Sequence, residues 1–189
     1  MIYYKHKLNL FKEAGFMLRS ILIFPKLSEI TTIQNIRREL DPLYPHIRPH
    51  ITLVFPFESE ATDEVIIQNI QTILKPFSAF NVTFENFSSD EKSYLWLPID
   101  EGCSVIQKMH DVLYQSPLFS PFLRPEFPYT PHITVGQIHN QQAMLSTLKV
   151  LNSKQLQIHA EIDTVSIEHI LDNDDSDEFF QITLSRPKK

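Results

Sequence analysis

Apolar residues recur every three or four positions in several stretches of this chain, which is the spacing of one face of an α-helix. The clearest stretch carries Ile30, Ile33, Ile36 and Leu40 at this spacing. The same criterion applied to the whole chain predicts helices over residues 27–40, 61–74, 102–115 and 141–150.

Other stretches are continuously apolar or alternate with a period of two, as β-strands do. Within residues 80–87, for example, Phe80, Val82 and Phe84 alternate with polar side chains. The pattern predicts strands over residues 19–24, 80–87, 94–98, 158–171 and 179–185. We expect the strand over 80–87 to pair with the strand over 94–98 across the polar turn SSDEK, and DNDDSDE to join the last two strands.

The tetrapeptide Pro-His-Ile-Thr occurs twice, beginning at Pro49 and at Pro131, each time after a proline-broken segment. Proline has no N–H and disfavours helix in the residue before it, so each copy is expected to begin a strand. Alternate side chains of a strand share a face. In the first copy His50 and Thr52 therefore point one way, and the apolar residues Ile51, Leu53, Phe55 and Phe57 point the other.

The second half of the chain repeats the order of the first: helix, loop, Pro-His-Ile-Thr, helix, strand, strand. This order predicts an α+β fold of two similar lobes, each a mostly antiparallel sheet with flanking helices. We expect a pseudo-two-fold axis between the lobes and a central cleft in which both tetrapeptides meet.

The composition is that of a globular protein with one domain, since 42% of the 189 residues are hydrophobic and 21% are charged. A net charge of −6 argues against broad binding to duplex nucleic acid, which needs clustered Lys and Arg. Three glycines leave almost no material for a phosphate-binding glycine loop. Cys103 is the only cysteine, and no apolar run approaches the roughly 20 residues of a membrane span, so we expect a cytoplasmic protein.

Residues 1–16 allow two interpretations. Purine-rich codons for residues 12–15 could form a ribosome-binding sequence shortly before Met17, in which case Met17 is the initiator and residues 1–16 are an extension. Otherwise residues 1–16 form a genuine flexible tail or terminal helix. In both cases residues 17–189 are expected to form the single bilobal domain.

Two imidazoles that meet across a cleft, each beside a hydroxyl, suit phosphodiester chemistry. A neutral histidine can take a proton from attacking water, and a protonated histidine can give one to the leaving oxygen. Hydroxyl groups such as those of Thr52 and Thr134 can donate hydrogen bonds to the non-bridging phosphate oxygens, where charge has to be stabilised.

The motifs His50-Ile51-Thr52 and His132-Ile133-Thr134 resemble the signature of the 2H phosphoesterase superfamily, which includes bacterial 2′-5′ RNA ligase-like proteins and cyclic nucleotide phosphodiesterases. The similarity in layout runs from about Leu18 to the end of the chain. The resemblance implies a metal-independent enzyme without a cofactor that acts on a 2′,3′-cyclic phosphate or a 2′-5′ linkage of a small nucleotide or an RNA end. It implies that His50 and His132 are the acid–base pair and that Thr52 and Thr134 hold the phosphate.

Two other functions stay open at this point. The chain could be a module that binds nucleotides or RNA ends with weak or no turnover. It could also be an RNA ligase, but no lysine motif that accepts a nucleotidyl group is visible, so ligation is expected only as the reverse of hydrolysis.

The chain departs from the family pattern directly after the second motif, where many relatives carry a basic residue and this chain has Gly136 and Gln137. Gln137 can donate a hydrogen bond to a substrate but adds no charge. Arg48 and Arg124, in the two segments that approach the motifs, are candidates to supply that charge, or they are solvated loop residues.

Three aromatic residues near the motifs, Tyr129, Tyr44 and Phe57, could stack on a base or belong to the core. His46 and His50 have the spacing of zinc ligands on a helix, but Pro49 excludes a helix there, so no metal site is expected. The acidic segment DNDDSDE lacks the Gly and Glu of a calcium-binding loop and is expected to be a solvated turn.

Overall fold

The computed structural model describes residues 17–126 and 128–186. Residues 1–16, for which two interpretations were open, lie outside the described residues. The helices confirm the predicted segments: α2 (Ile30–Leu40), α3 (Asp63–Leu74), α4 (Cys103–Tyr114) and α5 (Gln141–Asn152), with a short 3₁₀ turn η1 (Ser120–Phe122). Side-chain oxygens of Thr62 and Asn140 accept hydrogen bonds from the first turns of α3 and α5, which fixes where these helices begin.

The strands form three antiparallel sheets. The four-stranded sheet has the order β10-β9-β1-β3, and the two three-stranded sheets have the orders β2-β8-β4 and β5-β6-β7. In chain order the strands are β1 (Leu18–Ile23), β2 (Lys26–Leu27), β3 (Ile51–Glu58), β4 (Phe80–Thr83), β5 (Ser88–Ser89), β6 (Tyr94–Pro98), β7 (His132–Gln137), β8 (His159–Ile162), β9 (Thr164–Ile170) and β10 (Ser176–Thr183).

The predicted pairing of strand 80–87 with strand 94–98 is wrong. β4 ends at Thr83 and pairs with β8, whereas β6 pairs with β5 and β7. The segments keep only local contact, through a bridge between Phe84 and Ile99 and a 3.0 Å hydrogen bond from the amide of Glu85 to the carbonyl oxygen of Pro98. The predicted strand over 158–171 is also two strands, because the chain passes from one sheet to another at Asp163.

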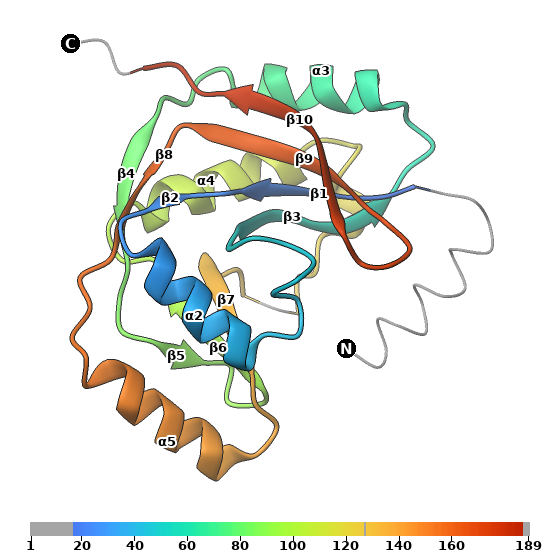
Figure 1. Ribbon diagram of the computed structural model, residues 1–189. Coiled ribbons are helices and arrows are strands. Elements are labelled where there is room, and N and C mark those ends of the chain that lie inside the picture. The colour runs from blue at the N-terminus through green and yellow to red at the C-terminus, as the bar shows by residue number, and fades with distance from the viewer. Residues whose placement is uncertain (1–16, 127, 187–189) are drawn as a thin grey trace.

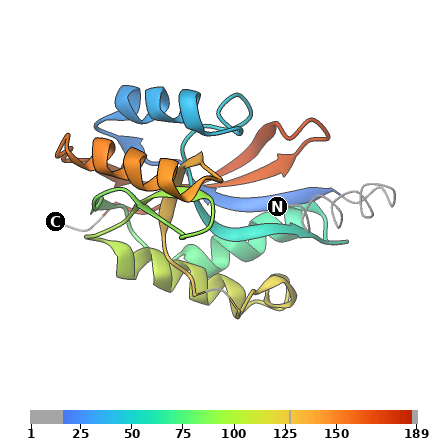
Figure 2. The same cartoon turned by 90° about the horizontal axis from the view of Figure 1, so that it is seen from below.

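The strands form a layer between two pairs of helices (Figures 1 and 2). Helices α3 and α4 lie on one side of the strands, and α2 and α5 lie on the other. β3 and β7 are the two strands that carry the Pro-His-Ile-Thr motifs. Helix α4 packs on β3 and helix α2 packs on β7, so helices from different layers cover these two motif strands. The α+β fold is therefore confirmed.

The sheets do not follow the two halves of the sequence. The four-stranded sheet combines β1 and β3 from the first half with β9 and β10 from the end of the chain. The two motif strands, β3 and β7, are each the edge strand of their sheet, and they lie next to each other. This arrangement brings the two tetrapeptides together from distant parts of the chain.

Candidate active site

Each tetrapeptide lies where a motif strand begins, as the prolines predict. His50 immediately precedes β3, and His132 is the first residue of β7. The isoleucine after each histidine is fully buried, whereas the threonine after it is only half-buried. The buried isoleucines anchor both strands in the core and leave the His-Thr face toward the neighbouring strand and solvent.

The predicted alternation of β3 holds only as far as Leu53. Val54 is also fully buried, and Phe55 is half-buried, because the pairing of β3 with β1 shifts register twice in this region. Contrary to the prediction, Phe55 therefore does not belong to the buried apolar face, whereas Phe57 does, as predicted. A bulged strand accommodates an extra residue in this way.

The two histidines make equivalent hydrogen bonds, each to the carbonyl oxygen of the residue two positions earlier. Nδ1 of His50 lies 3.0 Å from the carbonyl oxygen of Arg48, and Nδ1 of His132 lies 2.6 Å from the carbonyl oxygen of Thr130. A carbonyl oxygen only accepts hydrogen bonds, so Nδ1 carries a proton in both rings. The free nitrogen in both cases is Nε2, which can then accept or donate the proton of a reaction.

A different aromatic ring packs against each imidazole. The ring of Trp96 in β6 stacks on His132 with a centroid distance of 4.2 Å and an interplanar angle of 18°. The ring of Phe24 meets His50 edge-on at 6.1 Å. Trp96 is a site residue that the sequence reasoning missed, since finding it requires knowing that β6 pairs with β7 and places Trp96 opposite Thr134.

Both imidazoles have lowered pKa values. Burial lowers the pKa of His50 to about 4, the charges of Arg37 and His132 lower it further, and the Arg48 carbonyl and Asp41 partly oppose this. Burial also lowers the pKa of His132, against the Thr130 carbonyl and Asp90. The charge of His132 acts on His50, so the two rings share one electrostatic environment.

Tyr129 connects the two motifs. Its hydroxyl donates a hydrogen bond of 2.8 Å to the carbonyl oxygen of Thr52, and its ring stacks on His110 at a centroid distance of 3.7 Å. Burial raises the pKa of the phenol far above its usual value, so the hydroxyl keeps its proton and remains a donor. One ring face is thus covered, and the predicted stacking of a base on Tyr129 would have to use the other face.

The remaining candidates lie around the first motif and at the end of β7. Arg48 forms an ion pair with Glu178, and its guanidinium lies over the ring of Phe24 at 3.9 Å. Arg124 lies over the ring of Phe55 at 4.9 Å. Gln137 is the last residue of β7, opposite Tyr94.

The other two aromatic candidates have different surroundings. Phe57 is fully buried against Phe119 at 5.3 Å and belongs to the core, so it is not a stacking surface for a base. Tyr44 is half-buried, with the guanidinium of Arg38 over its ring at 5.4 Å.

Packing accounts for the glycine that follows the second motif. A Cβ atom at Gly136 would lie 2.7 Å from Cβ of Leu40, at the end of α2. Two carbon atoms are not in favourable contact until about 3.5–4.0 Å. The close approach of α2 to β7 therefore disfavours any larger residue at this position, including a basic one, unless α2 and β7 move apart.

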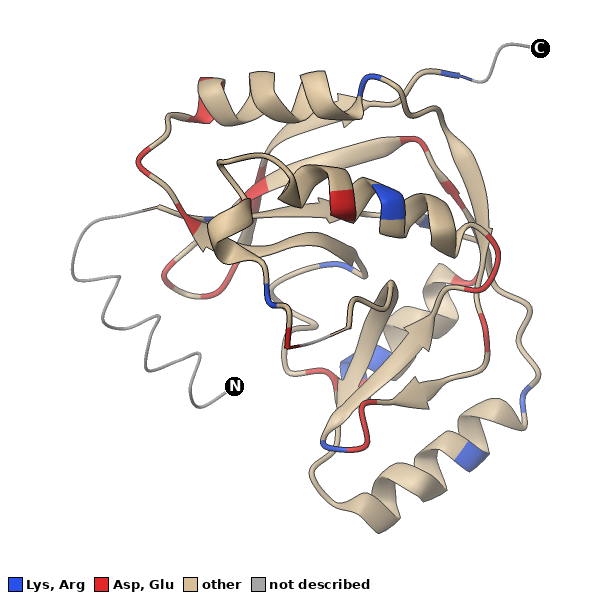
Figure 3. Ribbon diagram, turned by 180° about the vertical axis from the view of Figure 1, so that it is seen from behind, with Lys and Arg blue, Asp and Glu red and all other residues tan. Residues whose placement is uncertain are grey.

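The part of the chain that the structure describes has neither a concentrated basic face nor a cluster of metal-ligating side chains. Lys and Arg are spread over several elements rather than gathered on one face (Figure 3). Residues 17–126 and 128–186 contain no group of three or more His, Cys, Asp or Glu side chains that could hold a metal ion. None of the helices described is long and apolar enough to cross a membrane.

Comparisons with known proteins agree on one family. The family model described as 2′-5′ RNA ligase superfamily matches residues 24–174. A Halalkalibacterium halodurans protein with the name "Putative phosphoesterase" is 29% identical over 161 residues, which cover 81% of this chain and 89% of that protein. A Geobacillus kaustophilus protein with the same description is 32% identical over 123 residues, which cover 62% of this chain and 67% of that protein.

The fold is also shared with a solved structure. The crystal structure of E. coli LigT complexed with 3′-AMP has a TM-score of 0.60 at 11% sequence identity, and the match covers 90% of this chain and 99% of that chain. The matched family segment contains both His-Thr motifs, which the fold places on adjacent edge strands. The chain therefore belongs to the 2′-5′ RNA ligase superfamily, the 2H phosphoesterases.

Proposed function

We propose that this protein is a metal-independent phosphoesterase that hydrolyses a 2′,3′-cyclic phosphate or a 2′-5′ phosphodiester of a nucleotide or RNA end. His50 and His132 are the acid–base pair. The observation that carries the proposal is the matched geometry of the two rings, each with Nδ1 bound to a carbonyl oxygen two residues earlier, on neighbouring edge strands.

In the reaction, Nε2 of one neutral histidine takes a proton from water as the water oxygen forms a bond to phosphorus. The bond from phosphorus to the 2′ or 3′ ester oxygen breaks, and Nε2 of the other, protonated histidine gives a proton to this leaving oxygen. The hydroxyls of Thr52 and Thr134 donate hydrogen bonds to the non-bridging oxygens, where negative charge accumulates. The Nδ1 hydrogen bonds keep both rings in the orientation that this exchange needs.

The lowered pKa values leave both histidines neutral at pH 7 in the free protein. A bound phosphate diester is an anion, and an opposite charge nearby raises the pKa of an imidazole. Substrate binding therefore favours the uptake of one proton by the pair, which produces the acid while the other histidine remains the base. Because the two rings are coupled, this proton belongs to the pair rather than to one residue.

The relatives support a nucleotide substrate. LigT structures have been solved with 3′-AMP, ATP and NADP⁺, which are small nucleotides. Relatives that carry the name "Putative phosphoesterase" are similar to this chain over 81% of its length. We transfer to this chain the class of ligand, a nucleotide with at least one phosphate.

The test is hydrolysis of 2′,3′-cyclic nucleotides by the purified protein, by His50→Ala and by His132→Ala. His159→Ala is the matched control, because His159 is exposed on β8. We expect turnover by the protein and by the control, and a loss of at least a hundredfold in each motif variant.

Turnover should survive prolonged EDTA treatment. Activity that EDTA abolishes and zinc or manganese restores would contradict the mechanism, and tight nucleotide binding without turnover would favour the binding module.

A further inference from the structure

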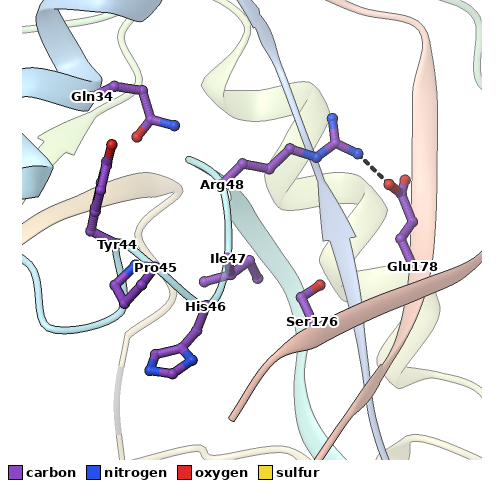
Figure 4. Close-up of a pocket in the computed structure, with 8 residues that line it drawn as sticks. All are labelled: Gln34, Tyr44, Pro45, His46, Ile47, Arg48, Ser176 and Glu178. Atoms are coloured by element: carbon purple, nitrogen blue, oxygen red, sulfur yellow. Dashed lines mark hydrogen bonds and ion pairs between the residues drawn. The ribbon is translucent and has the colours of Figure 1, made fainter. Parts of the chain in front are cut away.

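A cavity of about 470 Å³ lies beside the first motif, between the segment 41–48 and the beginning of β10. Its volume is within the range of small-ligand sites. The residues that line it are Gln34, Tyr44, Pro45, His46, Ile47, Arg48, Ser176 and Glu178. Figure 4 shows Gln34 and Tyr44 on one side, with Arg48 extending to Glu178 on the other.

The cavity and His50 share a continuous wall. Arg48 lines the cavity, and its carbonyl oxygen accepts the hydrogen bond from Nδ1 of His50. The guanidinium of Arg48 lies over Phe24, whose ring edge meets the ring of His50. Two residues of chain span at most about 7 Å, so the Cα atom of Arg48 lies within that distance of the Cα atom of His50.

The cavity also opens on the same face of the four-stranded sheet as Thr52. Thr52 lies opposite Leu22, which in turn lies opposite Ser166. Glu168, two residues after Ser166, lies opposite Glu178. Residues directly opposite each other, and residues two apart on a strand, share a face. A ligand held at Thr52 can therefore continue along the sheet to the cavity.

The wall formed by segment 41–48 is fixed in place before any ligand binds. The fully buried Arg37 donates to Asp41 at 2.8 Å and to the carbonyl oxygen of Ile47 at 2.8 Å. The amide of Ser176 donates to the carbonyl oxygen of His46 at 3.0 Å, which ties the segment to β10. Such a preorganised site loses little conformational freedom on binding.

The charges in the cavity are largely paired. Arg48 is neutralised by Glu178, and His46 lies 2.8 Å from Asp175. A second phosphate would gain little from Arg48 and His46, because an acidic side chain already pairs with each of them. A neutral group is a better fit than an anion.

The cavity does hold free hydrogen-bond donors next to flat surfaces. The side-chain oxygen of Gln34 accepts from Arg37, which leaves the amide NH₂ group free to donate. The hydroxyl oxygen of Tyr44 accepts from Nε of Arg38, which leaves its proton free. The guanidinium of Arg38 covers one face of the Tyr44 ring, which leaves the other face and the adjacent Pro45 as flat apolar surface. This chemistry matches a planar heterocycle that carries acceptors on its edge.

We propose that this cavity is the nucleobase subsite, and that it holds the base of the nucleotide whose phosphate lies between His50 and His132. Gln34 and Tyr44 donate hydrogen bonds to the ring nitrogens or carbonyl oxygens of the base. This inference rests on the proposed function and deepens it, because it makes a nucleoside phosphate, rather than any cyclic phosphate, the preferred substrate.

The test compares two substrates that share the reacting group. One is adenosine 2′,3′-cyclic phosphate, and the other is 1,4-anhydroribitol 2,3-cyclic phosphate, which lacks the base. We expect the protein to prefer the nucleoside, and we expect Gln34→Leu to lower the ratio of the two kcat/KM values by roughly tenfold, the effect of one lost hydrogen bond. Gln71→Leu, the same change on the exposed face of α3, is the matched control and should leave the ratio unchanged.

Equal kcat/KM on both substrates, or a ratio that Gln34→Leu does not alter, would overturn the subsite. If neither substrate is hydrolysed, the proposed function fails, and the subsite is then tested by titrating 3′-AMP into labelled protein and following NMR shifts. Shifts at the Gln34 side-chain amide that occur with 3′-AMP, but not with ribose 3-phosphate, which lacks the base, would support the subsite. Their absence with 3′-AMP would overturn it.

Discussion

The central feature at the scale of residues is that the protein orients its two histidines by backbone rather than by side chains. Carbonyl oxygens of Arg48 and Thr130 hold the Nδ1 atoms, so no substitution at these positions removes the acceptor itself. The side chains that surround the rings, Phe24 and Trp96, differ between the two sites. The shared geometry supports a shared type of chemistry, and the different neighbours allow the two rings to have different pKa values.

The threonines of the motifs allow a test of the phosphate contacts. Thr52→Val and Thr134→Val keep the β-branched shape that a strand accepts and remove only the hydroxyl. If the hydroxyl donates to developing charge, each change should lower kcat by up to about 10²–10³. Phosphate-ester hydrolysis and far-UV circular dichroism measure the two effects separately. Thr183→Val, on the exposed side of β10, is the control, and full activity in both motif variants would contradict the phosphate-binding role.

Tyr129 allows a test of how the second motif is positioned. Tyr129→Phe removes the hydrogen bond to the Thr52 carbonyl and keeps the ring that stacks on His110. The neighbouring carbonyl of Thr130 orients His132, so a looser segment should disorder the proposed acid–base pair. We expect kcat to fall by up to about tenfold, the effect of one hydrogen bond, with KM nearly unchanged. A rise in KM at constant kcat would instead indicate that Tyr129 contacts the substrate.

At the scale of elements, the contact between α2 and β7 determines which residues can follow the second motif. Gly136 is fully covered by the end of α2, with Leu40 as the nearest side chain. Helix α2 comes from the first part of the chain and covers the strand that carries the second motif. The same helix contributes the buried Arg37, which holds the segment before the first motif. One helix therefore supports both motifs.

Gly136→Ala tests this contact. The added methyl group would lie 2.7 Å from Cβ of Leu40, so α2 and β7 would have to move apart. Overpacking of this kind costs about 1–3 kcal/mol in the free energy of unfolding. Urea denaturation should show the loss, with Asn81→Ala on the exposed side of β4 as the control. An unchanged midpoint in Gly136→Ala would show that the contact is loose.

At the scale of the whole molecule, the partial burial of the two motif imidazoles and the effect of one on the other should determine the pH dependence of the site. The proposed mechanism needs one neutral and one protonated histidine. Both pKa values are lowered in the free protein, that of His50 to about 4, so this form is populated mainly below the ordinary imidazole pKa of about 6.5.

The pH profiles of kcat/KM and kcat should therefore differ. The profile of kcat/KM reports the free protein and should reach its maximum below about pH 6.5, falling as the pH rises. The profile of kcat reports the complex, in which the phosphate raises the histidine pKa values, so its maximum should lie at higher pH. Initial rates over pH 4 to 9 measure both. A kcat/KM maximum on the alkaline side of the kcat maximum would contradict the role of substrate charge.

The fold and the motifs could be predicted to different degrees. Short-range effects of neighbouring residues on the backbone account for the four helices, for the strands that begin just after Pro49 and Pro131, and for the burial of Ile51 and Ile133. The pairing of β4 was predicted wrongly, because two alternating strands close in sequence are not bound to pair when a distant strand such as β8 packs better.

The sequence by itself determined which chemical groups are present and how each is presented: a histidine and a threonine on one side of a strand, anchored by isoleucine on the other. Only the tertiary structure decided what surrounds these groups. Trp96 on His132, the Tyr129 hydroxyl on Thr52 and the cavity beside Arg48 all join residues distant in the chain. Such contacts depend on how whole sheets and helices pack, and local sequence preferences act over only a few residues.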